Sequence, residues 1–174
     1  MMYKRVFTLR IWPIIGFLIS GAMLAGAYGF QYIGGLEPCI MCHWQRHAHR
    51  AVLGVAGLTV LISLFVASRV WLRGLNALIG VAFLISTAYG FAHVGVEFSW
   101  WDGPAACAVS DKMDLGGKSL LDALDDPLEI VQCSDVTWSM LGLSMAGWNA
   151  LISAVAAFIS FSVAIKGKYY EQSR

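Results

Sequence analysis

Four cysteines, in two pairs of different spacing, are the residues of this chain best suited to chemistry. Cys39 and Cys42 form a Cys-x-x-Cys pair, whereas Cys107 and Cys133 lie much farther apart along the chain. A disulfide between the close pair would restrict little chain entropy, and its geometry suits thiol–disulfide exchange. We therefore interpret Cys39 and Cys42 as redox-active. The distant pair could close into a second disulfide in an oxidising compartment.

Histidines beside the close pair allow two metal-based alternatives. Cys39, Cys42 and His43 match the Cys-x-x-Cys-His attachment signature of a c-type haem. With His47 added, the same residues could supply four zinc ligands. The segment is short for a haem pocket, and thiolates in an oxidising compartment tend to form disulfides. We therefore expect no metal, and a haem electron carrier stays an alternative.

The chain that carries these cysteines is unusually apolar as a whole. Of the 174 residues, 58% are hydrophobic and 13% are charged, and the mean hydropathy is +0.66. Soluble domains usually carry about 25% charged residues. The net charge of +1 offers no electrostatic field for nucleic acid. The composition predicts an integral membrane protein that does not bind nucleic acid.

Four nearly uncharged stretches are long enough to cross a bilayer as helices, which takes about 20 residues each. The predicted fold is an all-α integral membrane bundle of four transmembrane helices in a single domain, residues 1–174. The spans are expected at approximately 11–33, 48–68, 74–95 and 145–165, with a short outer loop at 34–47 and a long one at 96–144. Within the long loop, the spacing of leucines predicts a surface helix over Ser119–Gln132.

The distribution of basic residues predicts the orientation, because cytoplasmic flanks are enriched in lysine and arginine. Most of the basic residues fall on the side of the termini: Lys4, Arg5, Arg10, Arg69, Arg73, Lys166, Lys168 and Arg174. Both termini are therefore expected inside, and all four cysteines outside. A signal peptide cleaved after Ala27 is the alternative for the first span, and it would leave the following loop outside as well.

The second span also bears on the chemistry of the close pair. If its helix begins near Cys42, the free N–H groups and the positive end of the helix dipole would stabilise a thiolate there. The sequence thus predicts a lowered pKa for the Cys42 thiol.

The segment Gly35–Arg46 resembles the first outer loop of the bacterial disulfide bond formation protein B (DsbB) family. That family has Pro-Cys-x-x-Cys followed by Gln-Arg or Glu-Arg, here Pro38 to Cys42 and then Gln45 and Arg46. The resemblance continues through Cys133–Trp138 and Leu141–Met145 and covers nearly the whole chain. It implies a multi-pass protein of the bacterial inner membrane with cysteines facing the periplasm.

The resemblance also implies a role for each cysteine. Cys107, paired with Cys133, would be attacked by a reduced thioredoxin-like protein of the DsbA type. Cys133 would exchange with Cys39, and Cys42 would face a membrane quinone. The chain would thus be a protein-dithiol:quinone oxidoreductase.

Arg46 and His93 correspond to residues of the family's quinone site. Arg46 would favour negative charge on the thiolate and the quinone, and His93 would assist proton transfer. The alternatives are an interfacial arginine and an interfacial histidine without a role. The roles of His43, His47 and His49 stay open, as does the choice between ubiquinone and menaquinone.

A vitamin K epoxide reductase-like enzyme is the remaining alternative, because it also combines a four-helix bundle, a Cys-x-x-Cys and a quinone. In that family the Cys-x-x-Cys lies late in the chain, whereas Cys39 and Cys42 follow the first span. The order of the cysteines therefore favours the DsbB family.

Overall fold

The computed structural model describes residues 9–65, 68–108 and 132–167, and four long helices dominate them. These are α2 (Trp12–Tyr32), α3 (Ile40–Phe65), α4 (Arg69–Glu97) and α7 (Met145–Lys166). Each is long and apolar enough to cross a membrane. The predicted four-helix membrane bundle is therefore confirmed. Residues 119–131 of the predicted surface helix lie outside the described residues.

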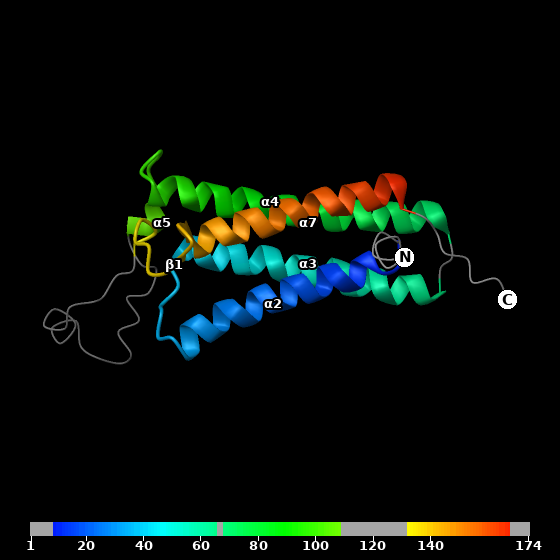
Figure 1. Ribbon diagram of the computed structural model, residues 1–174, viewed down its shortest axis with the longest axis horizontal. Helices are drawn as coiled ribbons and strands as arrows, with labels where there is room; N and C mark the ends of the chain where they lie inside the picture. Colours follow the sequence, from blue (N-terminus) through cyan, green and yellow to red (C-terminus); the bar gives the residue numbers. More distant parts are fainter. Residues whose placement is uncertain (1–8, 66–67, 109–131, 168–174) are drawn as a thin grey trace, which may run out of the picture.

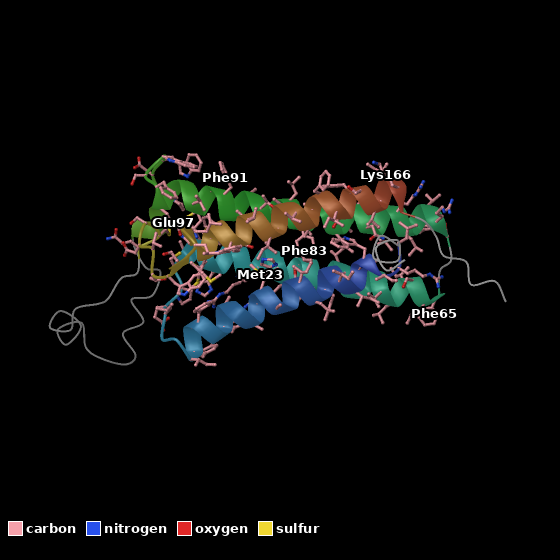
Figure 2. The ribbon with its side chains drawn as sticks, viewed as in Figure 1. Met23, Phe65, Phe83, Phe91, Glu97 and Lys166 are labelled. Carbon is pink, nitrogen blue, oxygen red and sulfur yellow. A yellow bond between two sulfur atoms is a disulfide. The ribbon has the colours of Figure 1, made fainter. Side chains whose placement is uncertain are left out.

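The four helices run antiparallel to their neighbours in the sequence (Figure 1). α2 begins and α7 ends at the same end of the bundle, as expected for four spans. The opposite end carries the start of α3, the short helix α5 (Ala105–Ala108) and a small hairpin. Glu97 marks this end in Figure 2, whereas Phe65 and Lys166 mark the other. We call the two ends the cysteine end and the Lys166 end.

Local sequence signals explain where two of the helices begin. Pro13 stands in the first turn of α2, where its missing N–H costs nothing. Ser144 caps α7, because its Oγ accepts a hydrogen bond of 3.1 Å from the N–H of Gly147. The last helix begins at Met145, directly after this cap.

Two helices extend beyond the spans expected from hydropathy. α3 begins at Ile40 rather than near residue 48, and α4 begins at Arg69 rather than near residue 74. Residues 40–47, expected in the short outer loop, are therefore helical. Helix formation does not stop where hydropathy falls, because backbone hydrogen bonding continues through polar residues such as Gln45 and Arg46. The close cysteine pair consequently lies at the start of a helix.

Packing is closest between α4 and α7. A Cβ atom on Gly90 would lie 2.9 Å from the backbone nitrogen of Ala150, so only glycine allows this approach. A core of fully buried side chains from α3, α4 and α7 fills the centre: Val52, Ala56, Leu72, Ile79, Phe83 and Val163. Side chains facing outward are also large and apolar, as expected for a surface in contact with lipid: Leu61, Leu64, Phe65, Trp71 and Phe158.

α2 packs along α3 but has few contacts with α7. Figure 1 shows α2 diverging from α7 toward the cysteine end. This divergence makes room for a cavity between the two helices.

A two-stranded hairpin is the one departure from helical structure among the described elements. β1 (Ser139–Met140) pairs antiparallel with β2 (Leu143–Ser144). Leu141 and Gly142, between them, have φ angles of 53° and 80°. Positive φ at both positions is what a two-residue hairpin turn requires, at some strain for leucine. The hairpin leads directly into α7.

Candidate functional site

Cys107 and Cys133 form a disulfide, with their Cα atoms 5.4 Å apart. Cys107 is 8% exposed and Cys133 is 1% exposed. A cavity of about 310 Å³ borders both residues. Gly103 lies against the bond, since a Cβ there would come within 3.3 Å of the Cys107 sulfur. The structure thus forms the pair that the sequence resemblance implied, with Cys107 the more accessible member.

Cys39 and Cys42 are free thiols whose sulfur atoms lie 3.1 Å apart. Because α3 begins at Ile40, Cys39 takes the capping position and its sulfur accepts the backbone N–H of Cys42 at 3.4 Å. When Cys39 is a thiolate, only the Cys42 thiol can donate in the contact between the two sulfur atoms, so it hydrogen-bonds to Cys39. This hydrogen bond is the main reason why the pKa of Cys39 is lowered to about 4, with burial acting in the opposite direction and His93 lowering it further.

The prediction that the helix start stabilises a thiolate on Cys42 is therefore wrong. It assumed that the helix begins near Cys42, whereas the first turn begins two residues earlier, at Ile40. The N–H groups of that turn consequently serve Cys39. Once Cys39 is ionised, Cys42 is the hydrogen-bond donor of the pair.

His93 links the two cysteine pairs. Its Nε2 lies 3.6 Å from the sulfur of Cys39 and 3.1 Å from the backbone oxygen of Cys133. Both pairs belong to one buried cluster with Met41 and Val96. The fold therefore brings residues from four separate segments into contact at the cysteine end.

The same closeness raises the question of a metal. The Sγ atoms of Cys39 and Cys42 and a ring nitrogen of His93 all lie within 4.8 Å of one another. A structural zinc site needs four ligands, and no fourth His, Cys, Asp or Glu joins this group among the described residues. His43 and His47, which the sequence suggested as ligands, are not part of it. Within the described residues, this group therefore falls one ligand short of a structural zinc site.

A cavity of about 460 Å³ lies on the other side of Cys42, where α2 diverges from α7. Its walls come from α2, α3, α7 and the segment before α7: they include Ala27, Phe30, Cys42, Arg46, Trp138 and Met145. This size and a mostly apolar wall with a few polar groups are typical of small-molecule sites. Cys42 and Arg46 both belong to the wall of this cavity.

Arg46 is buried, and α2 holds it in place. Its Nη1 donates to Gln31 Oε1 at 2.5 Å, its Nη2 donates to the backbone oxygen of Ala27 at 3.1 Å, and the guanidinium lies 5.0 Å from the ring centroid of Tyr28. This arrangement fixes a positive charge at the cavity wall near Cys42. It is unlike a snorkelling arginine, whose charged group would reach toward water.

A row of hydrogen-bonded, buried polar side chains beside the site was not predicted from the sequence. Gln45 Nε2 lies 2.8 Å from His93 Nδ1, and Asn149 Nδ2 donates to Gln45 Oε1 at 2.6 Å. His49 Nε2 lies 2.7 Å from Asn149 Oδ1, and His49 Nδ1 lies 3.0 Å from Ser20 Oγ. The available signal was a set of polar residues at helical spacing inside apolar spans, where such groups need partners.

The three histidines of uncertain role therefore differ. His49 is buried in the cavity wall and belongs to this row of polar side chains. His47 is exposed and lies 3.2 Å from a guanidinium nitrogen of Arg50. His43 is partly buried.

Two cysteine pairs in contact, beside an apolar cavity at one end of a four-span bundle, define a membrane-embedded thiol–disulfide oxidoreductase. The family model described as "Disulfide bond formation protein DsbB" matches residues 9–163. The chain belongs to the DsbB family.

Relatives of the chain carry the same description. The disulfide bond formation protein B of Aromatoleum aromaticum is 35% identical over 161 residues, which cover 86% of this chain and 92% of that protein. Its counterpart in Nitrosococcus oceani is 32% identical over 154 residues, with 84% and 85% covered. No solved structure matches the chain at a significant level. Family membership favours neither the haem carrier nor the vitamin K epoxide reductase-like enzyme.

Proposed function

We propose that this protein reoxidises a periplasmic DsbA-like dithiol protein and passes the electrons to a membrane quinone. One observation carries the proposal. Cys42 borders an apolar cavity, while its partner Cys39 is joined through His93 to the segment of the Cys107–Cys133 disulfide. A route for two electrons from a soluble dithiol to a lipid-dissolved acceptor needs this order of groups.

The first step is attack by the partner's thiolate on the sulfur of Cys107. Cys107 is the more exposed member of its disulfide and borders the cavity of about 310 Å³. The Cys107–Cys133 bond breaks, a mixed disulfide with the partner forms, and Cys133 leaves as a thiolate. The partner's second thiol then releases the oxidised partner, so two electrons and two protons pass to Cys107 and Cys133.

The second step is exchange between the two cysteine pairs. The Cys133 thiolate attacks Cys39 of an oxidised Cys39–Cys42 pair, and Cys42 leaves with the electrons of the broken bond. Attack by Cys107 on Cys133 then re-forms their disulfide and expels Cys39. The lowered pKa of Cys39 makes it a good leaving group in this last attack.

The last step returns Cys39 and Cys42 to a disulfide. A quinone in the large cavity would accept two electrons and two protons. Cys42 lines that cavity, and the fixed guanidinium of Arg46 would favour negative charge on a sulfur or an oxygen beside it. The dithiol/disulfide couple of a DsbA-like protein has a high reduction potential, about −120 mV, so reoxidation of its dithiol needs an acceptor of still higher potential.

The test is turnover of the purified full-length protein with a reduced DsbA-type partner and a soluble quinone analogue. We expect quinone reduction by the wild type and none by Cys42→Ser or Cys107→Ser. His47→Gln is the matched control, because His47 is exposed and lies outside both cavities. Equal rates in wild type and Cys42→Ser would remove Cys42 from the mechanism. Parallel assays with ubiquinone and menaquinone analogues would decide between the two acceptors.

The proposed sidedness has a separate test. The excess of basic residues near the termini predicts cytoplasmic termini and periplasmic cysteines in the bacterial inner membrane. A membrane-impermeant maleimide should label reduced Cys107 in intact spheroplasts. Labelling only after lysis would contradict the orientation and the proposed partner together.

A further inference from the structure

A row of buried polar side chains joined by hydrogen bonds extends from His93, and its members other than His93 have no part in the proposed electron route. It crosses the bundle from His93 on α4, through Gln45 on α3 and Asn149 on α7, to His49 on α3 and Ser20 on α2. Gln45, His49, His93 and Asn149 are between 4% and 8% exposed, and Ser20 is fully buried. Buried polar groups need partners of the correct donor or acceptor type. The order of donors and acceptors must therefore be consistent from one end of this row of hydrogen bonds to the other, and we call that order its direction.

The direction can be read from the two ends of the row. The backbone oxygen of Cys133 can only accept, and it lies 3.1 Å from His93 Nε2, so Nε2 carries a proton. In a neutral ring Nδ1 is then an acceptor, which suits the amide nitrogen of Gln45 at 2.8 Å.

The other end of the row agrees with this direction. His49 Nε2 and the hydroxyls of Ser86 and Ser153 all converge on Asn149 Oδ1, at 2.7, 3.3 and 3.2 Å. With its oxygen engaged there, Asn149 offers its amide nitrogen to the Gln45 oxygen at 2.6 Å. Gln45 in turn must present its own amide nitrogen to His93.

The geometry points to Gln45 and Asn149 as positioning residues that hold His93 as a neutral ring, protonated on Nε2 and aimed at the Cys39 sulfur. A proton on Nδ1 would meet the amide nitrogen of Gln45. To accommodate it, Gln45 and Asn149 would both have to turn over, and His49 would have to move its proton from Nε2 to Nδ1. His93 therefore serves Cys39 as a hydrogen-bond donor rather than as a fixed positive charge.

Electrostatics alone would favour the opposite state. Burial of the ring disfavours a positive charge on His93, whereas a thiolate on Cys39 and the carboxylate of Glu97 attract one. The hydrogen bonds of Gln45 oppose that charge, because a neutral ring nitrogen is the partner they require. The significance of this arrangement for catalysis rests on the proposed function, whereas the protonation of the ring can be measured without turnover.

The test is long-range ¹H–¹⁵N correlation spectroscopy of the reduced full-length protein labelled in its histidines, which distinguishes protonated from bare ring nitrogens. A spectrum of His93→Gln assigns the His93 signals by difference. We expect Nε2 protonated and Nδ1 bare near neutral pH. A ring protonated on both nitrogens, or on Nδ1 alone, would overturn the inference.

Two substitutions test the cause. Gln45→Glu replaces the amide by a group that only accepts, so His93 should gain a proton on Nδ1 and become positively charged. Gln31→Glu is the matched control, since Gln31 contacts Arg46 and not His93. An unchanged His93 spectrum in Gln45→Glu would show that Gln45 does not set the protonation of the ring.

Asn149→Leu changes a residue that contacts Gln45 rather than His93 itself. It should free Gln45 to turn, give a mixture of both neutral forms of His93, and raise the pH at which Cys39 is half alkylated. Asn76→Leu removes another buried asparagine, one that contacts only backbone oxygens near the Lys166 end, and should change neither signal. A shift of the His93 signals in Asn76→Leu as large as in Asn149→Leu would indicate a general loss of packing and contradict the assigned role.

Discussion

Each end of the bundle buries an asparagine, and the two are used differently. Near the Lys166 end, Asn76 Nδ2 donates to the backbone oxygens of Leu9 and Leu72 at 3.0 and 2.8 Å. Its Oδ1 has no partner in the described part of the chain. At the cysteine end, Asn149 engages both side-chain atoms and connects to Gln45 and His49. Asn76 is a local clamp, whereas Asn149 is one member of a continuous row.

The surroundings of the two asparagines differ in the same way. Leu9, Leu72 and Val163 near the Lys166 end are fully buried, and Trp12 adds one hydrogen bond of 2.8 Å to Ser160. Stability there comes from close packing, which drives helix association in lipid. The cysteine end instead places thiols, imidazole and amides in contact around a cavity. The sulfur chemistry is therefore set by the polar side chains around the cavity, which apolar packing elsewhere in the bundle holds in place.

The largest effect of a substitution is expected at Cys42, at the cysteine end of the bundle. Cys42→Ala removes the hydrogen bond that contributes most to the lowered pKa of Cys39, so that pKa should rise from about 4 toward the ordinary value of about 8.5. Cys42→Ser keeps a hydroxyl donor and should retain much of the lowering. The measurement is the pH dependence of Cys39 alkylation, followed by mass spectrometry of its peptide.

The sign of the pH effect on stability follows from the same lowered pKa. The free energy of unfolding of the reduced wild type should increase as the pH rises from about 4 toward the usual thiol pKa. It should decrease again as the pH is lowered over the same range. Cys42→Ala should lack most of this dependence. An alkylation profile identical in wild type, Cys42→Ser and Cys42→Ala would contradict the assigned hydrogen bond.

A smaller effect is expected where α4 and α7 pack together. Gly90→Ala would place a methyl group against the backbone of Ala150, so the helices must separate, at a cost of about 1–3 kcal/mol. Gly54→Ala is the control, because a Cβ there meets nothing within 4 Å. That substitution should raise stability slightly through helix propensity. Thermal unfolding in detergent measures both, and equal shifts would show that the contact at Gly90 is not limiting.

Trp12→Phe probes the Lys166 end. It removes the buried hydrogen bond from Nε1 to Ser160 Oγ and should lower the free energy of unfolding by about 1 kcal/mol. The alkylation profile of Cys39 should stay unchanged, since the two sites share no polar contact. A change in that profile would mean that the two ends are coupled.

The smallest effect is expected at Thr59, which is fully buried. Its hydroxyl donates to the backbone oxygen of Val55, four residues earlier on the same helix, at 2.7 Å. Thr59→Val removes the hydroxyl donor, and the backbone oxygen of Val55 that accepted from it remains part of the helix. Stability should change by less than about 0.5 kcal/mol, and a loss above about 1 kcal/mol would assign this hydroxyl a larger role.

Much of the fold could be predicted because span length and hydropathy are properties of short segments. The four helices followed from uncharged runs long enough to cross a membrane. The start of α3 did not follow, since no hydropathy change marks Ile40. That difference of a few residues moved the predicted thiolate from Cys42 to Cys39.

A membrane protein of four spans, with cysteines in one close and one distant pair, could be predicted because these features depend on residue type and spacing alone. Which sulfur is stabilised as a thiolate, and which side chains meet His93, depends on how the helices pack. Gln45 and Asn149 are 104 residues apart and meet only where α3 packs beside α7. Such contacts depend on the relative rotation of two helices, which no local pattern specifies.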